Sequence, residues 1–222
     1  MKKLKVTGIV IAVCIIALAA LAAGLVRYMG TPTSGEKIRA YDRPARALLV
    51  IDIQEDFTGT TARREMYPKA DIEPAIATVN SVIEKAQKRK WLIVYIRQEF
   101  KGVPAIISKV FLGGVAINGT PGAQVDKRVA IRSDHILTKP IGDSFSNPAL
   151  GALLVKNRVN ELFLTGLDAE HCVHNTAQGA LNRGYGVTIV TDAILLGAKE
   201  KWNGLLEEYK KEGIHLIQNT DL

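Results

Sequence analysis

One segment constrains the fold of this chain more than any other. From Ala45 to Ile53 the residues read Ala-Arg-Ala-Leu-Leu-Val-Ile-Asp-Ile, an almost continuous apolar run that ends beside an acid. Strands that are apolar on both faces are typical of a parallel sheet covered by helices on both sides. We therefore expect a central buried strand here, with Asp52 at its carboxyl end.

Strand and helix patterns alternate along the rest of the chain. Pro74 begins a helical spacing of apolar residues that closes on the basic run Lys85 to Lys90. Further strands are predicted at residues 91–97, 136–139, 161–165, 187–191 and 214–218, and helices from Pro148, Cys172 and Ala198. This alternation predicts a three-layer α/β/α domain with a mostly parallel, Rossmann-like sheet, in which ligands bind beyond the carboxyl ends of the strands.

A long connection interrupts the alternation at residues 98–132, which are rich in glycine and weakly periodic. Loops of this length inside a compact domain usually line or cover a functional site. We expect this stretch to form a lid or a pocket wall.

The N-terminal region contains a second apolar run, uncharged from Val6 to Val26 and about as long as a membrane-spanning helix. A cleaved signal peptide is the alternative, although its apolar core is usually shorter. More positive charge precedes the run than follows it, which places the rest of the chain outside the cytoplasm. We expect residues 1–30 to be an uncleaved single-pass anchor, 31–40 a Gly-, Pro-, Ser- and Thr-rich linker without packed structure, and 41–222 one folded domain.

The net charge of +7 does not indicate a nucleic-acid partner. Four of the cations lie in or beside the N-terminal apolar run, namely Lys2, Lys3, Lys5 and Arg27. The remaining +3 is too small for the electrostatic footprint of a nucleic-acid-binding protein. The two cysteines, Cys14 within the apolar run and Cys172 far from it, indicate neither a disulfide framework nor a zinc ribbon.

Three reactive side chains lie at or just after the carboxyl ends of separate predicted strands, so one edge of the sheet collects Asp52, Lys139 and Cys172. The dipole of the helix predicted from Cys172 favours a thiolate, and a neighbouring ammonium such as Lys139 would lower the thiol pKa further. A thiolate there is a competent nucleophile, for which Asp52 could accept and return the proton. Taken alone, each residue is more common as a packing cysteine, a capping acid or a solvated lysine.

The sequence around these residues resembles the isochorismatase-like cysteine hydrolases over about residues 45–195. Leu48 to Phe57 is similar to the opening motif of that family, an apolar strand followed by D-x-Q-x-D-F. Lys139 to Phe145 resembles the second motif, a lysine followed five and six residues later by Ser and Phe. Gly166 to Ala177 resembles the third, in which a strand-end glycine leads to C-V-x-x-T-A.

The resemblance implies specific roles for matching residues. It makes Asp52 and Lys139 catalytic and Cys172 the nucleophile of a Cys-Asp-Lys triad. It also implies a cis peptide between Leu167 and Asp168, which directs the amides of Asp168 and Cys172 toward an oxyanion. Relatives commonly form oligomers, so we expect a homo-oligomer.

The chain departs from the nicotinamidase branch of the family, which binds a metal through Asp-x-His and a further His after the second strand. Here that region reads Arg97-Gln98-Glu99-Phe100-Lys101. His171 and His174 flank the nucleophile, but their spacing supplies two metal ligands at most. We expect the site to bind no metal and no other cofactor. We also expect that the protein is not a typical nicotinamidase.

An intact triad favours cleavage of a C–N bond in a small amide, carbamoyl or ureido substrate, because the family's isochorismatases cleave a vinyl ether without depending on a cysteine. Arg97 is a candidate for binding a substrate carboxylate, and Phe57 and Phe100 are candidate pocket walls. Vinyl-ether hydrolysis and a catalytically silent, membrane-tethered binding protein are the open alternatives. A redox-sensing thiol is a third, without a second cysteine in the folded part to resolve an oxidised form.

Overall fold

The computed structural model describes residues 27–60, 62 and 66–222, together with the isolated residues 16, 20 and 24. The expected anchor at Val6 to Val26 lies almost wholly outside the described residues. Within the described part of the chain, no helix is both long enough and apolar enough to cross a membrane. The anchor therefore stays a prediction from the sequence.

Six parallel strands form one sheet, as the alternating pattern predicted. Their order is β3-β2-β1-β4-β5-β6, so the chain begins in the middle, proceeds to one edge, returns beside β1 and continues to the other edge. Such a reversal, here between β1 and β4, opens a crevice at the carboxyl ends of the strands. The strands are β1 (Ala45–Ile51), β2 (Leu92–Gln98), β3 (Ile136–Lys139), β4 (Val159–Gly166), β5 (Gly186–Ile194) and β6 (His215–Ile217).

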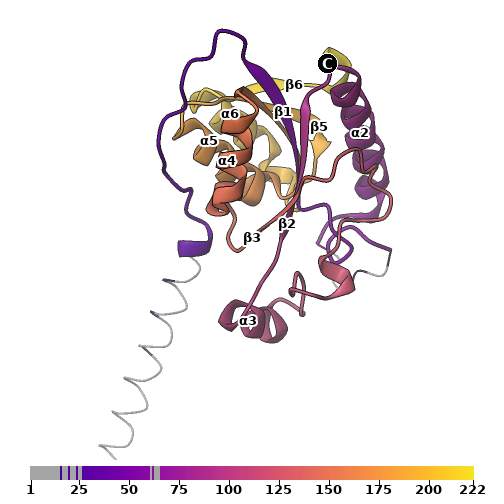
Figure 1. Ribbon diagram of the computed structural model, residues 1–222. Helices are drawn as coiled ribbons and strands as arrows, with labels where there is room; N and C mark the ends of the chain where they lie inside the picture. Colours follow the sequence, from indigo (N-terminus) through magenta and orange to yellow (C-terminus); the bar gives the residue numbers. More distant parts are fainter. Residues whose placement is uncertain (1–15, 17–19, 21–23, 25–26, 61, 63–65) are drawn as a thin grey trace, which may run out of the picture.

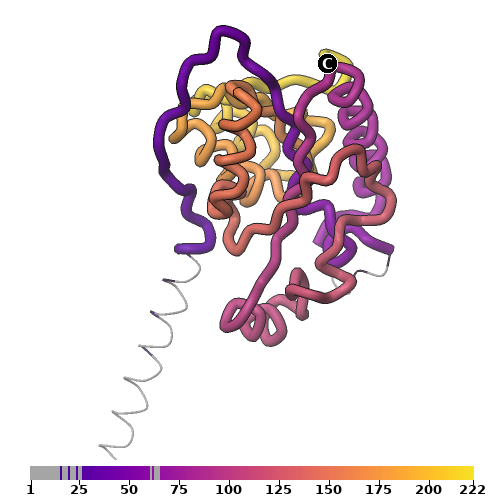
Figure 2. The backbone as a smooth tube through the Cα atoms, viewed as in Figure 1, coloured from indigo at the N-terminus to yellow at the C-terminus, as the bar shows by residue number. Residues whose placement is uncertain are grey.

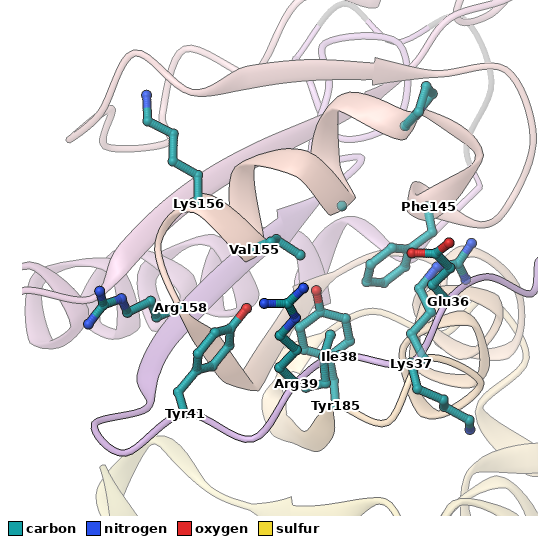
Figure 3. A pocket seen from close by; sticks show the side chains of 13 residues that line it. Glu36, Lys37, Ile38, Arg39, Tyr41, Phe145, Val155, Lys156, Arg158 and Tyr185 are labelled. Atoms are coloured by element: carbon teal, nitrogen blue, oxygen red, sulfur yellow. The ribbon is translucent and has the colours of Figure 1, made fainter.

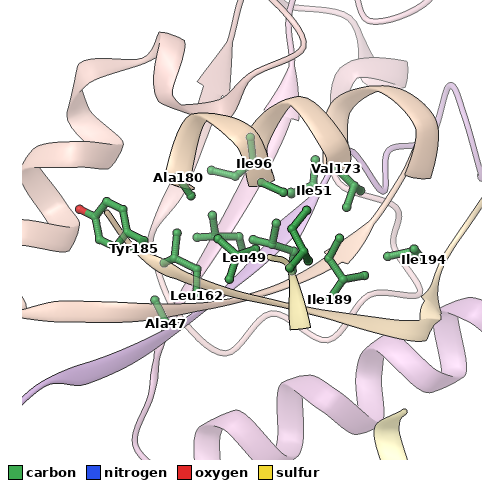
Figure 4. Packing of buried hydrophobic residues seen from close by; sticks show 14 of the residues in the cluster. Ala47, Leu49, Ile51, Ile96, Leu162, Val173, Ala180, Tyr185, Ile189 and Ile194 are labelled. Carbon is green, nitrogen blue, oxygen red and sulfur yellow. The ribbon is translucent and has the colours of Figure 1, made fainter. Parts of the chain in front are cut away.

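Helices cover both faces of the sheet (Figure 1). Alternate residues of β1 explain its unbroken apolar run, because Leu49 and Ile51 pack in one buried cluster and Leu48 and Val50 in the other. The first cluster lies under α4, α5 and α6 (Figure 4), and the second lies under α2. The helices are α2 (Lys69–Lys88), α3 (Val103–Phe111), α4 (Pro148–Lys156), α5 (His174–Leu181) and α6 (Trp202–Lys211).

Two helix starts differ from the prediction. α2 begins at Lys69, so Pro74 lies inside it, where the missing amide costs one hydrogen bond close to the helix start. The helix expected from Cys172 begins two residues later, at His174. Cys172 itself lies in a π-helical turn, Ala169–Val173, which connects β4 to α5.

The long connection at residues 98–132 is more ordered than its sequence suggested. It contains α3, in which only Ser108 is buried. Four large apolar residues of this helix face outward and are between 61% and 74% exposed: Val103, Ile106, Val110 and Phe111. The apolar residues Val103, Ile106, Ile107, Val110 and Phe111 recur at helical spacing, so the sequence carried a helical signal that its reading as a weakly periodic loop missed.

Residues 31–40 do not form the unpacked linker that we expected. Residues 29–38, which we call the strap, run along the outside of the α4 and α5 layer (Figure 2). The backbone N and Oγ1 of Thr33 donate to Asp143 Oδ2, at 2.7 Å and 2.6 Å. Arg183 donates to the carbonyls of Thr33 and Ser34, and Ile38 N donates to the Arg183 carbonyl. A segment held by such individual hydrogen bonds has no periodicity, so its composition alone was misleading.

Gly166 allows the close approach of β1 and β4, and we expect Gly166→Ala to destabilise the fold severely. Its φ is +115°, and an added Cβ would lie 2.0 Å from the carbonyl oxygen of Ile51. Backbone cannot yield as a side chain does, so we expect a loss of at least about 4 kcal/mol in the free energy of unfolding, measured by urea denaturation.

Gly151→Ala is the matched control, because a Cβ at Gly151 in α4 meets nothing within 4 Å. There we expect a gain of about 0.5 to 1 kcal/mol from higher helix propensity. Equal effects of the two substitutions would contradict the close approach.

Candidate active site

The sheet brings together the three side chains that the sequence selected. Asp52 follows β1, Lys139 ends β3, and Cys172 lies in the turn after β4. The Nζ of Lys139 lies 2.8 Å from Asp52 Oδ2 and 3.2 Å from Cys172 Sγ. Asp52 and Lys139 are almost completely buried, whereas Cys172 is partly exposed. Their catalytic roles stay predictions, but their geometry permits proton exchange.

Gln98 is a neighbour of the triad that the sequence reading missed. It ends β2, between β1 and β3, and its Oε1 accepts a hydrogen bond from Lys139 Nζ at 2.7 Å. Its Nε2 donates to the Lys139 carbonyl at 3.0 Å, and its backbone N donates to Gln54 Oε1 at 2.7 Å. Gln98 therefore links Lys139 on β3 to the chain after β1, across the strand β2 in which it lies. A polar residue at the end of a buried strand was the available signal.

The Lys139 side chain is a buried ammonium. Burial by itself lowers the pKa of Lys139, but the charge of Asp52, together with the hydrogen bonds to Asp52 and Cys172, outweighs burial and raises this pKa above its ordinary value. Its Nζ also donates to the carbonyl of Ile141 at 3.2 Å. The ammonium is thus fixed in charge and in position.

Cys172 differs from the expectation of a resting thiolate. Burial raises the pKa of the Cys172 thiol to about 12; Lys139 lowers it, while Asp52 raises it further. The physical reason is that Asp52 already balances the charge of Lys139, so a thiolate would add an uncompensated buried charge. Burial and the neighbouring Asp52 therefore favour the thiol form of Cys172 over the thiolate.

Asp52 has one oxygen free to accept the thiol proton. Its Oδ1 is buried and accepts no hydrogen bond from any described residue, while Oδ2 pairs with Lys139. The backbone of Asp52 has a φ of +55°, a left-handed conformation that Asp tolerates better than most residues. The arrangement can therefore generate a nucleophile by moving a proton from sulfur to Oδ1.

The peptide bond between Leu167 and Asp168 is cis, as the resemblance implied. The Asp168 side chain accepts a hydrogen bond from the amide of Glu170 at 2.9 Å. Within the described residues, the amide of Asp168 itself donates to no acceptor. It is available to an oxyanion, although this use of the Asp168 and Cys172 amides stays a prediction.

Tyr67 is a second neighbour that no motif indicated. It is 4% exposed, and burial raises the pKa of its phenol well above the ordinary value, with further contributions from Asp168, Cys172 and Asp52. Asp168 is the largest of these charged contributions to the raised pKa of Tyr67. Together with Phe57 it lines a pocket of about 310 Å³. Tyr67 thus connects this pocket to the triad.

The three candidate substrate-binding residues occupy different settings. Phe57 lines the pocket beside Tyr67, whereas Phe100 is 7% exposed within the apolar cluster under α2. Arg97 is already paired, since its Nη2 lies 3.0 Å from Glu99 Oε1. A substrate carboxylate at Arg97 would have to compete with that ion pair. None of these roles is tested by the geometry, and they stay predictions.

A larger pocket, of about 780 Å³, lies between the strap and α4 (Figure 3). Tyr41, which lies just after the strap, and Tyr185 face this pocket. None of the triad residues lines it. Size therefore does not identify the reactive site. The convergence of Cys172, Asp52 and Lys139 identifies it instead.

Potential metal ligands gather at one place in the described part of the chain. His174, Glu208 and Glu212 offer ligand atoms within 4.8 Å of one another, and His174 Nε2 lies 2.7 Å from Glu212 Oε2. His171 is not part of this group; it pairs with Asp168 at 2.9 Å. The expectation of a metal-free site stays a prediction.

The fold and the site define a class: a parallel α/β protein with cysteine, lysine and aspartate converging at the reversal point of its sheet. The chain belongs to the isochorismatase family, because residues 46–221 match the isochorismatase domain. This confirms the resemblance inferred from the three motifs.

Three similar proteins are named as a hydrolase or as amidases. The chain is 30% identical over 171 residues to a streptothricin hydrolase of Streptomyces noursei, covering 77% of this chain and 60% of that protein. It thus spans three fifths of that relative's length. A pyrazinamidase of Pyrococcus horikoshii, solved in complex with zinc, is 28% identical with a TM-score of 0.65, covering 79% of this chain and 99% of that one. N-carbamoylsarcosine amidase from Thermoplasma acidophilum shares the fold, at 21% identity and a TM-score of 0.67, covering 79% and 96%.

Proposed function

We propose that this protein is a cysteine hydrolase that cleaves a C–N bond in a small amide, carbamoyl or ureido substrate. The observation that carries the proposal is the contact of one ammonium, Lys139 Nζ, with both Asp52 and Cys172. The names of the relatives support it, since two are amidases and the third is a streptothricin hydrolase. A catalytically silent binding protein would have no need of this buried charge arrangement.

The first half of the proposed reaction makes an acyl-enzyme. Asp52 Oδ1 takes the thiol proton as Cys172 Sγ attacks the carbonyl carbon, so a C–S bond forms as the C=O π bond opens. Lys139 keeps its proton, and its charge compensates the anion that the transfer creates. The amides of Asp168 and Cys172 donate to the tetrahedral oxyanion.

The second half releases both products. Asp52 gives its proton to the departing nitrogen, the C–N bond breaks, and the carbonyl re-forms as a thioester. Asp52, again a carboxylate, then takes a proton from water as the water attacks the thioester. Collapse of this intermediate breaks the C–S bond, returns the proton to sulfur and releases the acid.

We also propose that residues 1–30 anchor the enzyme in a membrane as a single pass, with the hydrolase domain outside the cytoplasm and assembled as a homo-oligomer. The uncharged run from Val6 to Val26 and the excess of preceding lysines support the anchor and its orientation. Labelling of single introduced cysteines by an impermeant reagent in intact cells tests the orientation, in a background that carries both Cys14→Ala and Cys172→Ala.

The direct test is ammonia release by the detergent-solubilised full chain across small amides, carbamoyl compounds and ureido compounds, with isochorismate included. We expect turnover of at least one C–N substrate, and an acyl adduct on Cys172 detected by mass spectrometry after acid quenching. Turnover of isochorismate alone would favour the vinyl-ether alternative. No turnover and no adduct across the panel would favour the binding protein.

Tyr67→Phe is expected to lower kcat/KM by about tenfold, because the variant keeps the ring but loses a buried hydroxyl that interacts with the charges of Asp168 and Asp52. Steady-state kinetics on the substrate found in the panel measure this. Tyr95→Phe is the matched control: its hydroxyl donates to the Ala130 carbonyl at 2.7 Å, outside the triad, and its kcat/KM should be unchanged. Equal losses in both variants would exclude a specific role for Tyr67.

A further inference from the structure

A single peptide unit connects the strap to the triad. The carbonyl of Ile141 accepts a hydrogen bond from Lys139 Nζ at 3.2 Å. The other end of the same peptide group, the N–H of Gly142, donates to the carbonyl of Met29 at 2.8 Å. Because a peptide group is planar and rigid, the position of Met29 helps to set the direction of the carbonyl that holds Lys139.

A second contact holds the next residue of this loop. Asp143 is fully buried, and its Oδ2 accepts both the amide and the hydroxyl of Thr33, while Oδ1 accepts the amide of Phe145 at 2.8 Å. The strap therefore supplies two of the three hydrogen bonds of a buried carboxyl group. Without the strap, Asp143 would have to find new partners, and the loop would have to move.

The fit between the strap and the domain is close. A Cβ at Gly142 would lie 3.0 Å from the Met29 carbonyl oxygen and 2.6 Å from Asn175 Nδ2. A Cβ at Gly35 would lie 2.8 Å from Arg183 Nε. The loop thus lies directly between the strap and α5, so a displacement of the strap is transmitted to the loop.

We propose that the strap is a positioning element of the active site, whose docking holds the loop of residues 140–143 so that Lys139 faces Cys172. Its catalytic meaning rests on the proposed hydrolase function; its effect on the thiol does not. Thr33 and the Met29 carbonyl are the positioning groups, since neither touches the reacting atoms. The segment that follows the apolar run Val6 to Val26 thereby becomes part of the working enzyme.

The test uses the full chain with four single substitutions. Thr33→Val removes the hydroxyl bond to Asp143 and keeps the shape of the side chain, and Thr33→Ser restores the bond. Thr31→Val is the matched control, because the Thr31 hydroxyl donates to the Arg27 carbonyl, just before the strap, at 2.6 Å. Arg183→Gln, which loosens the Thr33 and Ser34 carbonyls, perturbs the strap at a second point.

Two readouts separate positioning from simple stability. We expect Thr33→Val and Arg183→Gln to lower kcat by about fivefold or more with KM within about twofold, because Lys139 is displaced and substrate contacts are not. We also expect slower alkylation of Cys172 by iodoacetamide between pH 8 and 10, followed by mass spectrometry. Asp52 and Lys139 are the charges that face the thiol, and a displaced Lys139 stabilises the thiolate less.

Thr33→Ser and Thr31→Val should match the unmodified protein in both readouts. The proposal is overturned if Thr33→Val and Arg183→Gln change only the melting temperature, or if Thr31→Val behaves as Thr33→Val does. If no substrate is ever turned over but alkylation slows in Thr33→Val and recovers in Thr33→Ser, the strap proposal stands and the proposed function fails.

Discussion

Replacing Cys172 by alanine lowers kcat for ammonia release by at least about a thousandfold, because no other group of the site can form the acyl-enzyme. Cys172→Ala also loses the acyl adduct in the mass spectrum. The ion pair of Asp52 and Lys139 survives this substitution, so the circular dichroism spectrum and the melting temperature should change little.

Cys14→Ala is the matched control for that prediction. Cys14 is the other cysteine of the chain, it lies in the N-terminal apolar run, and its removal should leave kcat unchanged. A Cys172→Ala variant with more than about a tenth of the original kcat would exclude covalent catalysis at this residue.

Asp52→Asn produces two effects of opposite sign. Turnover falls by about a hundredfold to ten-thousandfold, because the variant cannot take the thiol proton or return it to the leaving nitrogen. The thiol nevertheless becomes more reactive: Asp52 raises the pKa of Cys172, so the variant lowers that pKa. Alkylation of Cys172 by iodoacetamide at neutral pH should be at least about fivefold faster than in the unmodified protein.

The pH profile of Cys172 alkylation directly tests the direction in which Asp52 shifts the pKa of Cys172. Burial raises the pKa of the thiol to about 12, so in the unmodified protein the rate should keep rising from pH 7 through pH 10 without a plateau. In Asp52→Asn the rise should begin at lower pH. Slower alkylation in this variant, or an early plateau in the unmodified protein, would contradict the charge arrangement derived for the resting site.

The sequence predicted the triad's location because each member follows a strand of a parallel sheet. Asp52, Lys139 and Cys172 were placed at one edge by the apolar runs before them, and the structure brings these side chains into contact. The sequence could not predict the protonation state of Cys172. The helix dipole and Lys139 favour a thiolate, but burial and Asp52 outweigh them, and both depend on tertiary packing.

Gln98 and Tyr67 were missed for different reasons. Gln98 carries a local signal, a polar side chain at the end of a buried strand, but its partner Lys139 is 41 residues away. Tyr67 carries no local signal at all, since only the folded chain brings it near Asp168. Residues 29–38 show a further limit: their composition resembles a linker, while their hydrogen bonds join them to residues more than a hundred positions away.

The order of the strands also affects how this protein behaves at high concentration. The two edge strands, β3 and β6, are the shortest of the sheet, with four and three residues. Long exposed edges are templates on which neighbouring molecules add strands and aggregate. Because these edges are short, the sheet offers few unpaired backbone groups for such growth, and association between copies would have to use side-chain surfaces instead.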